Sequence, residues 1–345
     1  MKTKSNILLS LVSSALACSL LLAGCGPAGP APSGGNGAKP AASKGPAQLF
    51  LLTGSTGGTY YALGGAIANS WNNHLKDKVK VTAQASGASV ENMKRINAGE
   101  AQIGMSMNNI AEDAWNGKGV FKSKTTHVRA IGVVYPEVLQ GVADANSNIK
   151  SIADLKGKTV AVGPTGSGSA VLAKDIFADL GLQFSEFKPE YIGFGDASNR
   201  MKDGHLDANF GVLAVPASAI TDIVTARKVN IIEFSNDDVK KLQAKYAFIS
   251  PFTIPAHTYG NDKAAQTISM QCALYCKDDV SEDVIYNLTK AFYENNKEIA
   301  AAHAAGKYID LAKALDGIST PLHSGAVKYY KEKNIKIPDK IMPVK

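Results

Sequence analysis

A strand, a glycine-rich turn and a helix follow one another twice in this chain, and this repeat constrains the fold more than any other sequence feature. In the first copy, the apolar run 49–52 leads into the turn 53–61, and apolar residues then recur at helical spacing. In the second copy, the run 159–162 leads into the turn 163–169 and another helix. Such units are typical of α/β proteins with buried parallel strands.

Both turns are candidate anion-binding sites. Glycine lets a ligand approach the backbone closely. The N-terminus of the following helix supplies unpaired N–H groups and about half a positive charge, which small anions bind. Many α/β proteins use glycine at this point only to turn sharply, and for one turn alone that alternative stays open. The second copy favours the binding function.

The first 47 residues have the pattern of an export segment rather than of a fold. Lys2 and Lys4 precede the apolar stretch 7–23, which favours a signal over a membrane-spanning helix of about 20 apolar residues. The sequence Leu-Ala-Gly-Cys at 22–25 resembles the lipobox of bacterial lipoproteins, which implies cleavage after residue 24 and a lipid on Cys25. The alternative is a chance cysteine in an ordinary signal. Residues 25–47 are rich in Gly, Pro, Ala and Ser and predict a flexible tether.

Net charge and cysteine spacing argue against a nucleic-acid-binding protein and against a disulfide. Loss of the signal lowers the formal net charge from +7 to +5, a mild surplus that is spread along the chain and does not indicate nucleic-acid binding. Cys272 and Cys276 remain in a strand-like run, where four residues of extended chain separate their Cα atoms by roughly 13 Å. A disulfide needs less than about 7 Å, so we expect two buried thiols unless the chain bends.

The pattern of strands and helices predicts two lobes, since 345 residues is long for one core. Predicted strands are 49–52, 78–86, 101–106, 127–135, 159–162, 207–213 and 267–275, and predicted helices are 90–98, 111–116, 151–157, 281–305 and 325–333. Gly99 and Gly204 are expected helix stops. The alternation implies parallel sheets with helices on both faces and a ligand beyond the carboxyl ends of the strands. Extended crossings near 139–143 and 248–255 predict a hinge, with lobe 1 formed by 48–138 and 250–345 and lobe 2 by 139–249.

Several motifs in order resemble the TAXI family of solute receptors of TRAP transporters. They are 54–61, 89–92, 135–137, 154–158, 166–168, 284–286 and 325–330, and the similarity covers nearly all of 49–333. The resemblance implies a type II periplasmic-binding-protein fold, with two doubly wound lobes that close on a small anionic ligand. It also implies an extracytoplasmic, lipid-anchored monomer that delivers glutamate-like or dicarboxylic acids to a TRAP permease, without catalysis, cofactor or nucleic acid. An ABC-transporter receptor or a ligand-sensing receptor of the same fold are the alternatives.

Three departures from the family pattern fall near the expected cleft. Met107-Asn108-Asn109 stand where the family often has Gln-Ser-Asp, and Ala214-Val215-Pro216 stand where Gly, an aromatic and Pro are common. His257 replaces the glycine of Pro-x-Gly-x-Tyr. His257 could line the cleft, with a surface or core position as the alternative. Ligand identity is therefore open, because one altered polar group in a buried site shifts preference strongly.

An enzyme is the rival class, and the motifs do not favour it. The first turn lacks the lysine of a P-loop, and the residues around Ser167 do not form the Gly-x-Ser-x-Gly elbow. The six histidines show no metal-ligand spacing.

We expect backbone N–H groups of Gly58, Thr59, Gly168 and Ser169 to bind carboxylate oxygens, helped by the hydroxyls of Thr56 and Ser167. Tyr60 and Tyr135 could stack on the ligand or merely fill a lobe surface. The full predicted site is Thr56, Gly57, Gly58, Thr59, Tyr60, Ser86, Ser89, Asn108, Asn109, Tyr135, Thr165, Gly166, Ser167, Gly168, Ser169 and Pro216.

Overall fold

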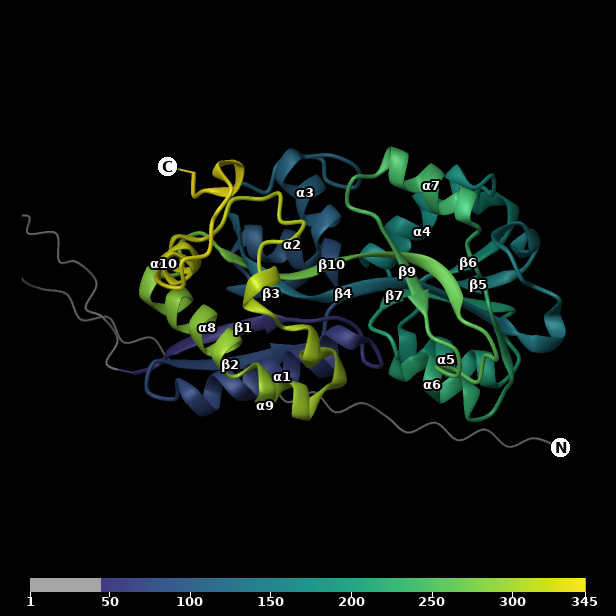
Figure 1. Ribbon diagram of the computed structural model, residues 1–345, viewed down its shortest axis with the longest axis horizontal. Coiled ribbons are helices and arrows are strands. Elements are labelled where there is room, and N and C mark those ends of the chain that lie inside the picture. The colour runs from purple at the N-terminus through teal and green to yellow at the C-terminus, as the bar shows by residue number, and fades with distance from the viewer. Residues whose placement is uncertain (1–44, 345) are drawn as a thin grey trace, which may run out of the picture. The chain divides into compact units, whose positions relative to one another are not determined.

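The computed structural model describes residues 45–344 (Figure 1). The predicted signal 1–24, Cys25 and nearly all of the tether 25–47 lie outside the described residues. Within 45–344, no helix combines the length and the apolar character that a membrane crossing needs.

The first group of elements follows the predicted order of strand and helix. It consists of β1 (Ala47–Leu52), α1 (Thr59–His74), β2 (Val79–Gln84), α2 (Ser89–Ala98), β3 (Ile103–Met107) and α3 (Asn108–Asn116). β1 pairs in parallel with both β2 and β3. Gly99 ends α2 in the left-handed conformation that favours glycine, as the sequence predicts.

The second group repeats this alternation. It consists of β5 (Thr159–Ala161), α4 (Gly168–Asp179), β6 (Lys188–Glu190), α5 (Phe194–Lys202), β7 (Ala208–Leu213), α6 (Ser218–Val224), β8 (Val229–Ile231) and α7 (Asn236–Lys245). β5 pairs in parallel with β6 and β7. Gly204 follows α5 with φ of 79°, again as expected for a helix stop.

Two long strands join the groups into one mixed sheet. The order is β2-β1-β3-β10-β4-β7-β5-β6, where β4 spans Val128–Asp144 and β10 spans Ala265–Lys277. β4 is antiparallel to β7 and β10, and β10 is antiparallel to β3. Parallel pairing is confirmed within each group, whereas the crossing strands β4 and β10 pair antiparallel. β4 leads from the first group to the second and β10 returns, so these neighbouring strands run in opposite directions.

Helices cover both faces of each group, which confirms the α/β class. In the first group, α2 and α3 lie on one side of the strands and α1 on the other, while α4 and α5 lie on opposite sides of the second group (Figure 1). The predicted helix 281–305 is divided into α8 (Glu282–Glu294) and α9 (Asn296–Ala302), and α10 spans Ser324–Glu332. The remaining elements are β9 (Ser250–Ile254), which pairs with β10, and 3-10 helices at Ala145–Ser147, Ile152–Leu155, Phe184–Glu186, Ala304–Tyr308, Leu311–Lys313 and Asp339–Ile341.

Cys272 and Cys276 lie on β10 as two buried free thiols, which confirms the sequence interpretation. An extended strand keeps residues four apart too distant to form a disulfide. Cys272 stands opposite Met107 of β3 and Tyr135 of β4 in the sheet register. The middle of the mixed sheet is therefore built from sulfur-bearing and aromatic side chains.

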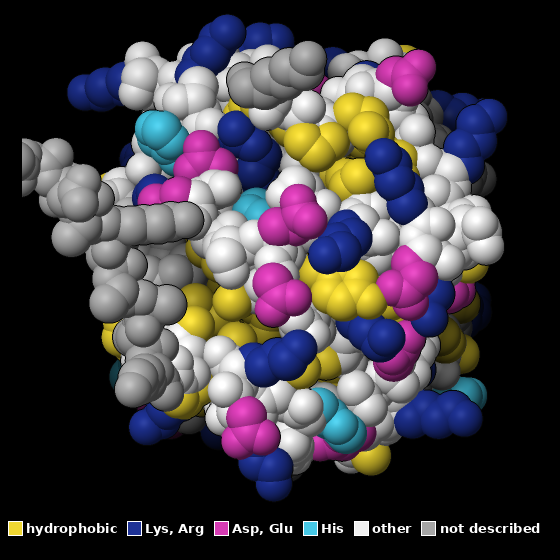
Figure 2. Space-filling model, turned by 90° about the vertical axis from the view of Figure 1, so that its left-hand side faces the viewer, with side chains coloured by type: hydrophobic (Ala, Val, Ile, Leu, Met, Phe, Trp, Pro, Cys, Tyr) yellow, Lys and Arg dark blue, Asp and Glu magenta, His cyan; other side chains and the backbone are white. Residues whose placement is uncertain are grey.

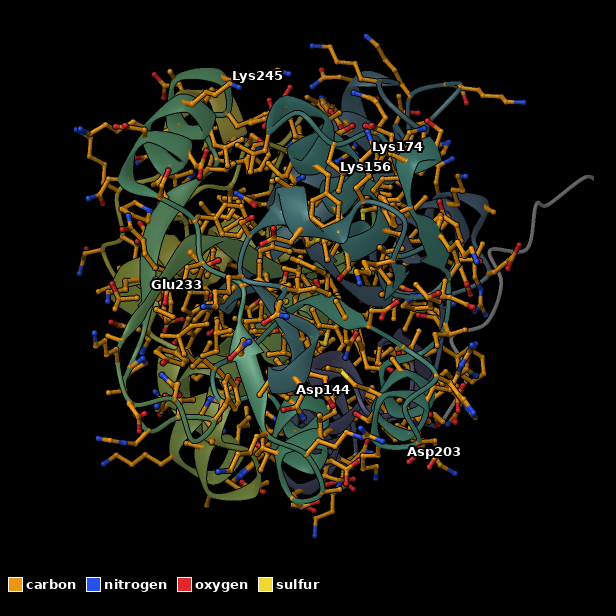
Figure 3. The ribbon with its side chains drawn as sticks, turned by 90° about the vertical axis from the view of Figure 1, so that its right-hand side faces the viewer. Asp144, Lys156, Lys174, Asp203, Glu233 and Lys245 are labelled. Atoms are coloured by element: carbon orange, nitrogen blue, oxygen red, sulfur yellow. The ribbon has the colours of Figure 1, made fainter. Side chains whose placement is uncertain are left out.

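Charged side chains lie mostly on the outside, in pairs of opposite sign. Figure 2 shows basic and acidic side chains interspersed over one face, without a continuous basic patch in that view. On the side shown in Figure 3, Lys156 pairs with Glu186 at 2.9 Å and Arg227 with Asp144 at 3.0 Å. The Lys156 pair, whose lysine is exposed, stabilises the fold only slightly, and the Arg227 pair is half-buried.

Candidate ligand-binding site

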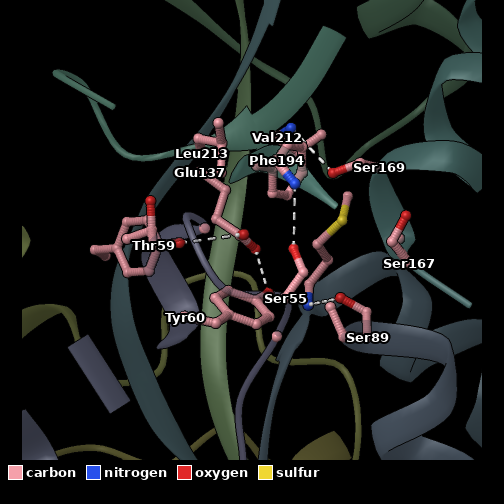
Figure 4. A pocket seen from close by; sticks show the side chains of 16 residues that line it. Ser55, Thr59, Tyr60, Ser89, Glu137, Ser167, Ser169, Phe194, Val212 and Leu213 are labelled. Atoms are coloured by element: carbon pink, nitrogen blue, oxygen red, sulfur yellow. Dashed lines mark hydrogen bonds between the residues drawn. The ribbon is translucent and has the colours of Figure 1, made fainter. Parts of the chain in front are cut away.

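A small cavity lies between the two glycine turns (Figure 4). Its volume is about 20 Å³, which is room for about one water molecule. Both groups of strands contribute to its wall, so the cavity joins the two copies of the repeat. It is lined by Gly54, Ser55, Gly58, Thr59, Tyr60, Ala88, Ser89, Met107, Tyr135, Glu137, Ser167, Gly168, Ser169, Phe194, Val212 and Leu213.

The two turns share one backbone geometry. Gly58 N–H donates to the Ser55 carbonyl and Ser167 N–H to the Pro164 carbonyl, each at 3.0 Å. The third residue of each turn is a glycine with positive φ, 83° at Gly57 and 82° at Gly166. A turn with glycine in the left-handed region at this position is of type II, which other residues adopt only with strain. The sequence repeat is therefore also a structural repeat.

Each turn leads directly into a helix whose N-terminus lies at the cavity. α1 and α4 have no acidic residue in their first turn, so no side-chain carboxylate there offsets the positive ends of these helices. Ser167 is the N-cap of α4, and its hydroxyl oxygen accepts from Ala170 N–H at 3.1 Å. Because that oxygen is an acceptor here, its proton stays free to donate to a ligand.

Hydroxyl groups at the start of α1 and α4 also connect both turns to β7. Thr59 Oγ1 accepts from Ala214 N–H at 3.0 Å, which links the start of α1 to the residue after β7. Ser169 Oγ accepts from Val212 N–H at 3.0 Å. These bonds hold the first residues of both helices against β7.

The second turn approaches the start of α2 and the end of β3 closely. The Gly166 carbonyl accepts from Val90 N–H at 3.1 Å and from Glu91 N–H at 3.2 Å. A Cβ added at Gly168 would lie 2.4 Å from the sulfur of Met107 and 2.9 Å from the hydroxyl of Ser89. A side chain at 168 would therefore displace the side chains of Met107 and Ser89.

Glu137 lines the cavity and is absent from the site that the sequence predicts. It is 1% exposed, and its two carboxyl oxygens accept from Tyr60 at 2.8 Å and from Tyr135 at 3.4 Å (Figure 4). Burial raises the pKa of Glu137 to about 8, although the two tyrosine hydroxyls lower it. The carboxyl is therefore mostly protonated at neutral pH.

The hydroxyls of both tyrosines donate to this carboxyl, while stacking of their rings on a ligand stays a prediction. The rings of Tyr60 and Tyr135 meet edge to face, with centroids 6.5 Å apart and planes at 86°. Burial raises the pKa of both hydroxyls, so they remain neutral donors. A sequence signal for Glu137 exists, because it is an acidic residue within the apolar run of β4.

The structure brings about half of the sequence-predicted residues to the cavity. The residues at the wall are Gly58, Thr59, Tyr60, Ser89, Tyr135, Ser167, Gly168 and Ser169. Thr56, Gly57 and Pro216 are exposed and lie outside the lining. Thr56 and Thr165 are each the second residue of their turn, which places them at its outer tip. The Gly58 N–H is used inside its own turn, so it is not a free donor.

Other predicted residues have structural partners or border another hollow. Ser86 donates to the Thr53 carbonyl and to Asn92, and Asn108 donates to the Gly317 carbonyl. Asn109 is buried at the start of α3, and its side-chain oxygen has no hydrogen-bond partner. Thr165 and Gly166 border a second hollow of about 560 Å³ between α2, α3 and α4. These residues lie outside the lining of the small cavity, and their part in ligand binding stays a prediction.

The cavity wall is suited to binding a small polar molecule. Among the described residues that line it, Glu137 is the single Asp, Glu, Lys, Arg or His. Within residues 45–344, no three His, Cys, Asp or Glu side chains gather into a group that could hold a metal ion. The available chemistry is hydrogen bonding by backbone N–H groups, hydroxyl groups and one buried carboxyl.

Comparison with solved structures finds similar chains at low identity. A structure from Bordetella bronchiseptica RB50 has a TM-score of 0.50 and 16% identity, and the match covers 85% of this chain and 91% of that one. The alkanesulfonate-binding protein SsuA from Xanthomonas axonopodis pv. citri gives 0.47 and 14%, with coverages of 86% and 96%. The aliphatic sulphonate binding protein SsuA from Escherichia coli gives 0.44 and 16%, with 83% of each chain covered.

The family comparison covers most of the chain. The model of the NMT1-like family matches residues 51–333, which include both glycine turns, the cavity and the two crossing strands. The chain therefore belongs to the NMT1-like family.

Proposed function

We propose that this protein is an extracytoplasmic solute-binding receptor that holds a small carboxylate between its two glycine turns. One observation carries the proposal: the N-termini of α1 and α4 face one cavity from the two strand groups, without an acidic residue in either first turn. Two positive helix ends at one point attract an anion.

The ligand class is a glutamate-like or dicarboxylic acid. The donors are the N–H groups of Thr59, Gly168 and Ser169, which begin their helices and have no intrahelical partner, together with the Ser167 hydroxyl. Thr56 and the Gly58 N–H leave the proposed set, for the geometric reasons given above. No cofactor has a part in this function.

Delivery to a TRAP permease is the proposed next step. It is supported by the resemblance of the motifs to the TAXI family, which spans both turns. An ABC-transporter receptor and a ligand-sensing receptor are the other candidates, because the same fold serves all three. The gene neighbours distinguish them: a large multi-helix permease gene supports TRAP transport, whereas an ATPase gene supports an ABC transporter.

Anchoring through a lipid on Cys25 is the proposed localisation. The Leu-Ala-Gly-Cys sequence and the tether that follows it support this anchor. We expect Cys25→Ser to move the protein from the membrane fraction to the soluble fraction. A variant that stays with the membrane would contradict lipidation.

A ligand screen followed by two matched variants tests the binding function. Small acids that bind the folded protein raise its melting temperature. With an acid found in this way, calorimetry on Ser167→Ala is expected to show roughly ten- to a hundredfold weaker binding, because a hydrogen bond to a charged oxygen is lost.

Thr56→Ala is the control, because this hydroxyl belongs to the first turn but lies outside the cavity. The Thr56→Ala variant should bind the acid with the same affinity as the wild type. The proposal fails if Ser167→Ala also binds normally, or if the acids leave the melting temperature unchanged.

A further inference from the structure

Glu137 is a buried acid for which the described cavity provides no cation. Its carboxyl accepts from Tyr60 of α1 and Tyr135 of β4. The neighbouring strand β10 contributes the buried Cys272, which stands opposite Tyr135, and the buried Tyr275. Burial raises the pKa of each of these four groups, so all of them are uncharged near neutral pH. Buried charges in proteins are normally paired. Among the described residues that line the cavity, the ionised form of Glu137 therefore has no cationic partner. A molecule that enters the cavity can supply one.

The geometry leaves capacity for such a partner. Each carboxyl oxygen accepts one tyrosine hydroxyl, at 2.8 Å and 3.4 Å. Two carboxylate oxygens together offer about four acceptor positions, so about two remain. The tyrosines also orient the carboxyl, because both hydroxyls hold it toward the cavity (Figure 4).

The cavity wall therefore combines two electrostatic features. One is the pair of helix N-termini of α1 and α4, which suits a carboxylate. The other is Glu137, which is nearly fully buried and carries negative charge once ionised. A ligand with an anionic and a cationic group matches both features, whereas a diacid places its second carboxylate against another acid.

We propose that Glu137 is the subsite for an ammonium group, so that the receptor takes amino acids, and that ligand binding expels the Glu137 proton to solvent. This inference rests on the proposed carboxylate receptor. The neutral acid and the ligand ammonium become a carboxylate–ammonium pair, and one proton leaves to the buffer, so charge and atoms balance. The carboxyl–tyrosine set is thus a specificity-determining site.

A matched ligand panel tests the ammonium requirement on the exported chain, purified in mild detergent. The panel contains the proteinogenic L-amino acids and their deamino counterparts, such as L-glutamate with glutarate and L-alanine with propionate. We expect at least one amino acid to bind at least a hundredfold tighter than its deamino counterpart at pH 7. Deamino acids that bind equally well or better would overturn this inference and leave the carboxylate receptor intact. If no member binds, both proposals fall.

Proton release provides a second, independent readout. Calorimetry of the tightest amino acid at pH 7 in phosphate and in Tris, which differ in ionisation enthalpy, gives the number of protons exchanged. With a Glu137 pKa of about 8, about 0.9 proton should be released per ligand. Affinity should rise about tenfold per pH unit between pH 5.5 and 7.5 and level off above pH 8. Proton uptake, or affinity that falls through this range, would contradict the inference.

Variants of Glu137 separate charge from shape. Glu137→Gln keeps the size of the side chain, and it should abolish proton release, flatten the pH profile and weaken binding roughly a hundredfold. Glu137→Asp keeps the charge and should retain proton release with reduced affinity. Exposed Glu233, labelled in Figure 3, provides the control Glu233→Gln, which should behave as the wild type. Unchanged proton release in Glu137→Gln would overturn the assignment.

Discussion

At the scale of single residues, Glu137 should make the stability of the protein depend on pH. Its pKa is raised from 4.5 to about 8 in the folded state, so the folded protein holds a proton that the unfolded chain loses. The stabilisation from this group is complete below about pH 4.5 and is lost as the pH rises through about 8. The expected slope is roughly 1.4 kcal/mol per pH unit within that window.

Urea unfolding of the wild type and of Glu137→Gln at several pH values measures this effect. The difference in the free energy of unfolding, variant minus wild type, should increase as the pH rises from 5 to 8. Glu233→Gln, an exposed position, is the control and should follow the wild type. A constant difference between wild type and Glu137→Gln would show that Glu137 does not hold its proton.

A second residue-scale prediction concerns His257, which is exposed and does not line the cavity. It has φ of 66°, in the left-handed region where the resembling family has glycine. A non-glycine residue in this conformation destabilises the folded state by about 1–2 kcal/mol. Glycine avoids this strain, but it loses more backbone entropy on folding, which offsets about 0.5–1 kcal/mol of the gain. We therefore expect His257→Gly to raise the free energy of unfolding by roughly 0.5–1 kcal/mol.

The matched variant His257→Val should lower the stability, because a β-branched residue tolerates positive φ least. Chemical denaturation should rank the three proteins as Gly above His above Val. An equal stability of the glycine and valine variants would show that the backbone relaxes at this position.

At the scale of elements, one hydrogen-bond network fixes β4 to the segment between β9 and β10. The buried Tyr259 hydroxyl donates to Gln140 Oε1 at 2.5 Å and accepts from Ala217 N–H at 2.6 Å. Gln140 Nε2 in turn donates to the carbonyls of Leu213 and Ala214 at 3.2 and 3.1 Å. The network connects the crossing strand to the end of β7, beside the cavity.

We expect Tyr259→Phe to lower the free energy of unfolding by about 1–3 kcal/mol, because the Ala217 N–H is then buried without a partner. Urea denaturation measures this loss. Tyr61→Phe removes the same group from a side chain that is 44% exposed, and it should change stability little. Equal effects of the two variants would argue against the network as a strong connection.

At the scale of the whole molecule, the size of the cavity implies that ligand entry requires movement. A volume of about 20 Å³ holds about one water molecule. An amino acid has several times as many heavy atoms as water and does not fit. The two glycine turns must therefore separate before a ligand can enter. β4 and β10 connect the strand groups, so a rotation at these strands is the movement that we propose.

Small-angle scattering tests this movement with the acid found in the screen. The radius of gyration should be smaller with saturating ligand than without it, because the ligand holds the turns together. Identical curves for the wild type in both states would argue for a rigid body.

The lobe boundaries also belong to this scale and stay a prediction. Sequence patterns place the return crossing near 248–255, with residues from 250 onward in the first lobe. In the structure, Ile254, Tyr259 and Ala265 pack in one cluster with residues of the second group such as Met201 and Ile220. We therefore propose β10 as the return crossing.

Local sequence was sufficient for most elements and for the two turns. The period of apolar residues, the glycines at 57 and 166, and the helix stops at 99 and 204 act over a few residues, so they can be interpreted without knowledge of the fold. Tertiary structure alone decided that Tyr60 meets Glu137, which is 77 positions away. It also decided that β4 and β10 unite the strands into one sheet. The physical reason is that burial, pKa and strand pairing depend on packing between distant segments, which no local pattern encodes.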